Sequence, residues 1–283
     1  MPIHEKDVQN TLQILKLVED KYRYELADEN FPKTWKPKIL DVSTTVDNLL
    51  TSRKSLCRFG DGECTLMQGR GIGFQEYDAE LAEKLRQILA DEQTDCYVGI
   101  NRYYWYILDE PERNTNPVHY RFYTFNVPQY RNFYKAHCNK NKIYVDSCLG
   151  GYMSQKSLKF CEERFSKLKT LFKDKKLVIV SGDTVFDNIQ YDFFEDAAQK
   201  EFITAPRVNA FKNFDEILGK LLMYPKDYVM VLILGPTATV LAYELSKHGY
   251  ISYDIGHVPK DYDAYMKRAD RSAEAISKFY APD

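Results

Sequence analysis

Apolar positions recur at helical spacing near the start of the chain, and the pattern ends before Phe31-Pro32. The residues of this stripe are Val8, Leu12, Leu15, Leu17, Val18 and Tyr22. A second helix is predicted over residues 44–52. We therefore expect residues 1–52 to form a helical extension that packs on a main domain.

From residue 53 onward, short apolar runs alternate with segments of helical periodicity. Strands are predicted over 56–59, 96–100, 142–146, 177–181, 201–204, 228–234 and 251–254. Helices are predicted over 78–90, 127–137, 156–172, 214–223, 238–248 and 262–280. This alternation is typical of an α/β domain with a mostly parallel sheet and helices on both faces. Ligands of such domains bind outside the carboxyl ends of the strands, so the residues that follow each strand are of most interest.

Composition and charge exclude several classes of protein. The chain has 283 residues, a net charge of -2 and 44% hydrophobic residues, which is ordinary for a globular protein without a nucleic-acid partner. The apolar stretch 228–243 is too short to span a bilayer, and no signal-peptide pattern opens the chain. Six cysteines without a C-x-x-C pair suit reduced thiols. We expect a soluble, cytoplasmic protein.

Two carboxylates one residue apart follow the first predicted strand of this domain. Asp61 and Glu63 lie between glycines that allow a tight turn, so the two acids can converge on one point. A hard cation such as Mg²⁺ or Mn²⁺ between them would remove their mutual repulsion, and Mg²⁺ is often bound by one or two carboxylates with substrate phosphates. The alternative is a solvated turn in which Asp61 caps the segment that follows.

Gly235-Pro236-Thr237 leads directly from the predicted strand 228–234 into a helix. Proline fits a first helical turn, and a helix start with hydroxyl groups beside it attracts phosphate through its unpaired N–H groups and dipole. An ordinary strand-to-helix turn explains the same residues.

Two further strand ends carry polar or aromatic candidates. Asp254 and His257 follow the last strand, where a histidine can bind metal, hold a phosphate oxygen or move a proton, or have no chemical role. After the strand 201–204, Asn209 could read a base edge, Phe211 could stack on a base or belong to the core, and Arg207 could balance phosphate charge.

Other motifs argue against competing chemistry. The glycines of "GRGIG", residues 69–73, lack the G-x-G-x-x-G spacing and do not follow a strand, which indicates a flexible loop and not a dinucleotide fingerprint. The chain also lacks a G-x-S-x-G motif and a Walker-type loop.

Four sequence blocks, in this order, resemble those of one known family. They are "RFGDGE", "APRVNAF", "LGPTATVLAYELSKHGY" and "DIGH". Over residues 51–265 the chain resembles the bacterial GT-D-type glycosyltransferases, once catalogued as a domain of unknown function. The blocks GPTATVLAY and DIGH are specific when taken together, whereas GDGE alone is not. The resemblance implies a Rossmann-like fold of GT-D type for residues 53–283, within one domain overall.

The resemblance also implies roles for individual residues. Asp61 and Glu63 match the family's D-x-E motif, which is associated with a divalent metal, Mn²⁺ or Mg²⁺, and with the donor diphosphate. His257 matches the histidine that ends the D-I-G-H block, and is expected to join the other two as a catalytic residue and metal ligand. Binding of the nucleotide sugar is implied for Arg58, Gly60, Gly62, Asn209, Phe211, Gly235, Pro236 and Thr237.

The chain departs from the family pattern at three places. Gly150-Gly151 stands where the family has an Arg-Pro pair before a tyrosine, here Tyr152. The stretch 182–194 replaces a region rich in glycine and arginine, and Pro259 stands in place of an acidic residue. These departures affect the predicted acceptor and sugar and leave the D-x-E turn intact.

The resemblance implies a metal-dependent hexosyltransferase. Known members move a hexose from a UDP-sugar to a glycan, so we expect glucose or galactose as the sugar and a glycan on a protein or lipid carrier as the acceptor. A cation held by Asp61 and Glu63 would stabilise the leaving diphosphate. His257, Asp254 and an oxygen of the Asp61/Glu63 pair are the candidates for a general base.

Two alternatives stay open. A non-catalytic module that binds nucleotides or glycans is compatible with the departures, although the intact D-x-E turn argues against it. Another Rossmann-like enzyme that uses a nucleotide, such as a dehydrogenase or methyltransferase, would be expected to carry the missing glycine fingerprint. The helical extension could form a homodimer contact or cover the acceptor.

Overall fold

The computed structural model describes residues 36–92, 95–106, 117–153 and 158–280, together with helical positions between residues 5 and 22. The strands are β1 (Lys38–Leu40), β2 (Ser55–Arg58), β3 (Cys96–Ile100), β4 (Ile143–Asp146), β5 (Lys176–Gly182), β6 (Gln199–Ala205), β7 (Tyr228–Ile233) and β8 (Ile251–Asp254). The first helices are α2 (Val42–Ser52), α3 (Asp61–Met67), α4 (Ala79–Ala90), α5 (Tyr103–Tyr106) and α6 (Pro117–His137). Then come α7 (Leu158–Lys169), η3 (Ala210–Asn213), α8 (Phe214–Leu221), α9 (Pro236–Lys247), α10 (Val258–Met266) and α11 (Ala273–Tyr280).

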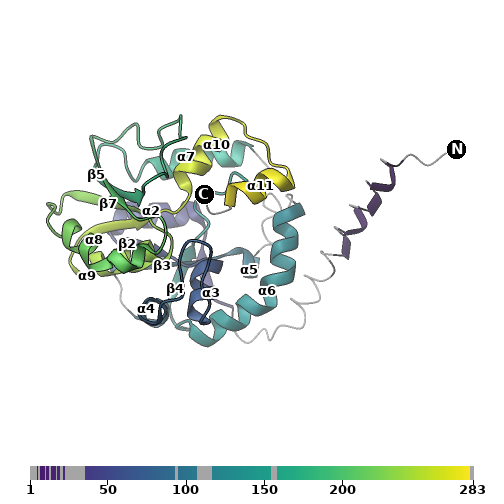
Figure 1. Cartoon of the computed structure of the whole chain (residues 1–283), viewed down its shortest axis with the longest axis horizontal. Helices are drawn as coiled ribbons and strands as arrows, with labels where there is room; N and C mark the ends of the chain where they lie inside the picture. The colour runs from purple at the N-terminus through teal and green to yellow at the C-terminus, as the bar shows by residue number, and fades with distance from the viewer. Residues whose placement is uncertain are drawn as a thin grey trace.

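Within the described residues, all strands join one eight-stranded sheet in the order β1-β4-β3-β2-β8-β7-β5-β6. Every strand pair is parallel. The predicted α/β fold with helices on both faces is confirmed, and the sheet is wholly parallel instead of mostly parallel. Figure 1 shows α10 and α11 on one side of the molecule and α3 and α4 on the other.

Alternating side chains of the central strands enter two separate cores, because successive residues of a strand point to opposite faces. In β7, Met230 and Leu232 belong to the core beneath α3, α4, α6, α8 and α9. Their neighbours Val229 and Val231 belong to the core beneath α2, α7, α10 and α11. Both faces of the sheet are therefore covered, which is why central strands such as β5 and β7 read as continuous apolar runs.

Several elements differ from the sequence-based expectation, among them α6, which begins at Pro117 and not near residue 127. β1 was not predicted, and it pairs with β4 at the edge of the sheet. α3 begins at Asp61, where a turn was expected. The short helix α5 was not predicted either. The single helix predicted over 262–280 is two helices, α10 and α11, and Arg268 between them has a φ of 52°, which no continuous helix allows.

Residues 1–52, predicted as a helical extension, include parts of the sheet domain itself. β1 belongs to the sheet, and α2 buries Val42, Val46 and Leu49 in one of the two cores. At the described positions between 5 and 22 the chain is helical, and its apolar side chains there are 43–71% exposed. Packing of this first helix against the domain stays a prediction.

All six cysteines are free, and five of them are buried. In the described part of the chain, none of the helices combines the length and the apolar character that crossing a membrane requires.

Candidate functional site

The strand order places the end of β2 at a topological switch point. β2 has β3 on one side and β8 on the other, so the chain fills one half of the sheet after β2 and the other half later. α9, which follows β7, packs against both β2 and β8. The turns that follow β2, β7 and β8 therefore lie together at the edge where parallel sheets bind ligands.

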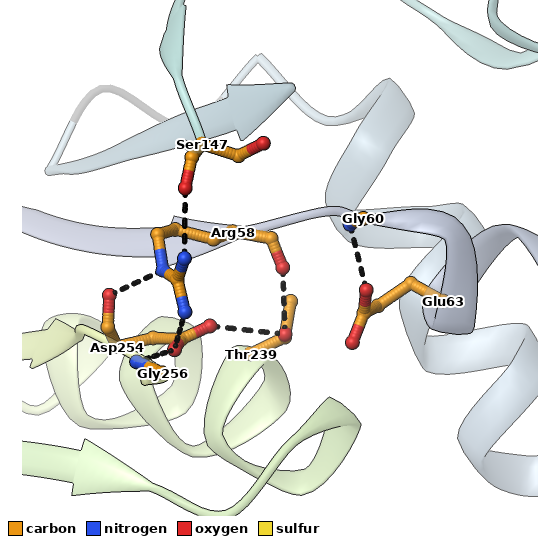
Figure 2. Close-up of polar contacts among 7 residues, drawn as sticks. All are labelled: Arg58, Gly60, Glu63, Ser147, Thr239, Asp254 and Gly256. Carbon is orange, nitrogen blue, oxygen red and sulfur yellow. Dashed lines mark hydrogen bonds and ion pairs between the residues drawn. The ribbon is translucent and has the colours of Figure 1, made fainter. Parts of the chain in front are cut away.

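Arg58, the last residue of β2, ties three strand ends together (Figure 2). Its Nε donates to the carbonyl of Asp254 at 2.8 Å, and its Nη1 donates to the carbonyl of Ser147 at 2.7 Å. Its Nη2 pairs with Asp254 Oδ1 at 3.0 Å. Gly256 must lack a side chain, because a Cβ there would lie 2.0 Å from Nη2. The guanidinium of Arg58 is thus engaged with the protein itself, and the contact with the nucleotide sugar that the resemblance implied stays a prediction.

Asp254 is the buried partner in this network. Its carboxylate accepts from Gly256 N at 3.2 Å, and Oδ2 lies 3.3 Å from the Thr239 hydroxyl. Burial raises the pKa of Asp254 above its usual value, and the neighbouring Arg58 guanidinium opposes this effect. The contacts of Asp254 give it a structural role and disfavour it as the general base.

The carboxylates of the D-x-E motif occupy the first turn of α3. Asp61 is exposed, whereas Glu63 is buried and its Oε2 accepts from Gly60 N at 2.7 Å. Glu63, and not Asp61, therefore caps the helix, with glycine on both sides of Asp61. Burial raises the pKa of Glu63 to about 7, and the nearby charges of Asp254 and Asp61 add to this effect. The two carboxylates bring negative charge to the first turn of α3, and a bound cation would neutralise that charge.

His257 lies at the start of α10, one turn beyond the end of β8. It is exposed, and its ring faces Phe279 of α11 edge-on at a centroid distance of 6.4 Å. Nowhere in the described ranges do three or more His, Cys, Asp or Glu side chains gather closely enough to hold a metal ion. The described part of the structure thus does not bring His257 into one ligand set with Asp61 and Glu63, and metal binding by these residues stays a prediction.

The start of α9 meets the same strand ends. Thr239 Oγ1 donates to the carbonyl of Arg58 at 2.8 Å, so the first turn of α9 is fixed beside the residues that lead into Asp61 (Figure 2). Gly235 has φ 52° and ψ -137°, which favours glycine, and Pro236 occupies the first turn of the helix as expected. Thr237 is 0% exposed, and its hydroxyl has no hydrogen-bond partner among the described residues. A buried hydroxyl without a partner at a helix start is unusual and suits an acceptor oxygen from a ligand.

Asn209 and Phe211 both have partners within the protein, and for Phe211 the structure confirms the alternative of a core position. Asn209 is in the left-handed conformation with φ 54°, and its side-chain Oδ1 accepts from Glu76 N at 2.7 Å. Phe211 is 7% exposed and packs on Phe214 at a centroid distance of 5.3 Å, so it belongs to the core. The structure shows both side chains engaged within the protein, and binding of the donor by either one stays a prediction.

A family model described as the glycosyltransferase GT-D fold matches residues 56–282. The chain belongs to the GT-D glycosyltransferase family. It is 30% identical over 269 residues to a probable glycosyl transferase Gly of Streptococcus gordonii, covering 88% of this chain and 36% of that protein. It is 28% identical over 247 residues to the glycosyltransferase GlyD of Streptococcus pneumoniae serotype 4, covering 85% of this chain and 29% of that protein. The chain spans about a third of the length of these curated relatives.

Solved structures of the same domain agree with this assignment. One, described as a conserved domain of unknown function with a distinct glycosyltransferase fold, superposes with a TM-score of 0.77 at 26% identity, covering 93% of this chain and 95% of that one. A glycosyltransferase from Streptococcus sanguinis superposes with a TM-score of 0.74 at 30% identity, covering 83% of this chain and 86% of that one. The GT-D resemblance is confirmed, and glycosyl transfer is the reaction class that these comparisons support.

The departure from the GT-D pattern at Gly150-Gly151 has a structural counterpart in α10. Asp261 Oδ2 accepts from Gly151 N at 2.8 Å, and a Cβ at residue 150 would lie 2.3 Å from the same oxygen. Arg164 donates to the carbonyls of Cys148 and Gly150 at 3.1 and 2.9 Å. The glycine pair therefore lets a buried carboxylate hold the loop after β4 at the edge of the site.

We predict that replacing Asp261 with asparagine changes how stability depends on pH. Burial raises the pKa of Asp261 from 3.8 to about 6, so the folded protein favours the neutral acid. The stability of the wild type relative to Asp261→Asn is greatest below pH 4 and falls as the pH rises through 6, by about 3 kcal/mol in all. Urea unfolding of both proteins between pH 4 and 8 measures this difference. Parallel pH profiles would show that the carboxyl does not titrate as described.

Several contacts at the site could not be predicted from the sequence. Thr239 and Arg58 each reach a partner almost two hundred positions away, at separations of 181 and 196 residues. Asp261 meets Gly151 across 110 residues. Such contacts carry no local pattern. The glycines at 150, 151 and 256 were the sequence signal for these contacts, since glycine often marks a place where the backbone approaches another group closely.

Proposed function

We propose that this GT-D domain transfers a hexose, with glucose or galactose the first candidates, from a UDP-sugar to a glycan acceptor in the presence of a divalent cation. The observation that carries the proposal is the hydrogen bond from Thr239 to the carbonyl of Arg58. It places the first turn of α9 beside the chain that leads into Asp61 and Glu63. A helix start for phosphate and a carboxylate pair for a cation thus share one edge of the sheet.

The residues at this edge fit a divalent cation. The two carboxylates supply the oxygen ligands that Mg²⁺ and Mn²⁺ prefer, and Mg²⁺ is commonly held by two carboxylates together with substrate phosphates. Asp61 and Glu63 would hold the ion, and Glu63 would use Oε1, since Oε2 already accepts from Gly60. When bound, the ion supplies Lewis-acid stabilisation to the diphosphate that leaves during sugar transfer.

The chain's own groups would bind and orient the donor beside this pair. The N–H groups at the start of α9 and the Thr237 hydroxyl would donate hydrogen bonds to phosphate oxygens. The network of Arg58 and Asp254 would keep the ends of β2 and β8 in place, which preorganises these donors. His257, exposed at the start of α10, would contact a phosphate oxygen or take the proton of the acceptor hydroxyl.

The acceptor we propose is a glycan on a protein or lipid carrier, and the proposed location is the cytoplasm. The names of the streptococcal relatives support a glycosyltransferase in general terms.

A panel of nucleotide sugars tests this proposal. Thermal melts with UDP-glucose, UDP-galactose and other nucleotide sugars, each with Mn²⁺ or with EDTA, should show metal-dependent stabilisation by a UDP-sugar. A ligand at a hundred times its Kd adds about 2.7 kcal/mol of stability, which corresponds to several degrees in Tm. Release of UDP without an acceptor should occur with Mn²⁺ only, and its absence would favour a non-catalytic binding module. Stabilisation by NAD or S-adenosylmethionine instead would favour a different nucleotide enzyme.

A further inference from the structure

The loop formed by residues 69–77, which contains the glycines of "GRGIG", lies between the two turns of the site. Its Ile72 lies against Gly62 of the D-x-E turn, since a Cβ at residue 62 would be 3.2 Å from Ile72 Cδ1. Its Phe74 lies against Gly235 before α9, where a Cβ would be 2.6 Å from the ring. One loop thus contacts both the carboxylate turn and the helix start.

The loop has a defined conformation that is fixed by residue 209. Ile72 and Gln75 form an antiparallel bridge within the loop. The backbone N of Asn209 donates to the carbonyl of Phe74 at 2.9 Å, and its Oδ1 accepts from Glu76 N at 2.7 Å. Lys212 adds an ion pair with Glu76 at 3.1 Å. The loop that was expected to be flexible is therefore held at Phe74 and at Glu76.

Phe74 is the aromatic side chain that this arrangement presents at the site. Its ring is half-buried and lies on the exposed Gly235, whereas Phe211, for which stacking was one of two predictions, is enclosed in the core. The left-handed φ of Asn209 is uncommon for a residue other than glycine, and such conformations cluster at ligand sites. The conformation of Asn209 here serves to orient the loop that carries Phe74.

We propose that Phe74, and not Phe211, is the side chain on which a ring of the nucleotide sugar stacks, and that Asn209 is the positioning residue that holds it. The inference rests on the proposed function. Aromatic rings bind flat partners through their faces, and both the nucleobase and the apolar face of a hexose offer such a partner. A stacking surface beside Gly235 would fix one end of the donor while α9 holds the diphosphate.

Isothermal titration of UDP and UDP-glucose with Mn²⁺ tests the inference. We expect Phe74→Ala to weaken binding by on the order of tenfold to a hundredfold, the range found for loss of one stacked ring, and Phe74→Tyr to restore it. Weaker binding of both ligands would assign the stacked ring to the base, and weaker binding of UDP-glucose alone would assign it to the sugar. Phe202→Ala is the matched control, because Phe202 is 58% exposed on β6 at the far edge of the sheet. Phe211→Leu keeps the core apolar and should bind as the wild type does.

Kinetics test the role of Asn209. Asn209→Ala removes the acceptor of the Glu76 N–H and should raise KM for the donor with little change in kcat, whereas Asn209→Asp keeps the acceptor and should restore KM. If Phe74→Ala binds UDP-glucose as tightly as the wild type, or if Phe211→Leu alone weakens binding, this inference is wrong and the proposed function stands. If the wild type binds none of the nucleotide sugars, the proposed function fails and the inference fails with it.

Discussion

Replacing Asp61 with asparagine is expected to lower kcat/KM for sugar transfer by about a hundredfold to a thousandfold, the range found when one charge-stabilising group is removed from an active site. The exposed side chain of Asp61 contributes little to packing, so Tm should change by only a few degrees. Glu63→Gln should have a similar effect on transfer, since the amide oxygen can still accept from Gly60 N while the ligand charge is lost. Donor turnover and thermal melts measure both effects.

Two comparison variants sharpen this prediction. Glu80→Gln removes an exposed acid from the first turn of α4 and should leave transfer unchanged. Glu63→Ala removes the cap of α3 as well as the charge, and should cost about 0.5–2 kcal/mol of stability in addition to activity. Near-normal turnover by Asp61→Asn or Glu63→Gln would remove the carboxylate pair from the mechanism.

Replacing Arg58 with methionine is expected to destabilise the protein by about 3–5 kcal/mol, the usual cost of removing one partner of a buried ion pair. Asp254, which is 4% exposed, would be left without its countercharge, and the carbonyls of Ser147 and Asp254 would lose their donors. Tm should fall by on the order of 10 °C. Chemical denaturation of wild type and variant measures the loss.

Because Arg58→Met leaves an unpaired charge on Asp254, its loss of stability should also depend on pH. The loss in Arg58→Met should be smaller at pH 4 than at pH 8, because an unpaired buried carboxyl is neutral at the lower pH. Asp254→Asn introduced into Arg58→Met should recover part of the stability, as a double-mutant cycle would show. A loss that is independent of pH and of residue 254 would contradict the role assigned to this pair.

The strands were the most predictable part of this molecule. β3 and β8 have the predicted bounds, and the other predicted strands agree to within two residues at each end. Burial on both faces explains this success for central strands such as β5 and β7, which are continuous apolar runs, whereas the edge strand β6 is largely exposed or half-buried. β1 escaped prediction because three residues carry too little pattern. α3 escaped because glycines disfavour a helix, and the cap that Glu63 provides, together with the burial of Leu66 and Met67, offsets them in the folded chain.

The site was predictable as a set of strand ends but not as a set of contacts. The turns after β2, β7 and β8 were singled out from the sequence, and the sheet order brings them together. The partners of Arg58, Asn209 and Phe211 could not be read from local patterns. Arg58 and Asn209 bond to residues 196 and 133 positions away, and the burial of Phe211 depends on tertiary packing.

β2 lies at the centre of the sheet, and this position affects how the protein folds during synthesis. β2 must wait for β8, whose Ser252 bonds to Ser55 across 197 residues, before its second edge is covered. During synthesis the emerging chain therefore exposes an incomplete sheet until β8 has left the ribosome. Contacts at this separation in sequence slow folding, and unpaired strand edges promote aggregation. We expect a nascent chain that stops before β8 to depend on chaperones and to lack any ability to bind a donor.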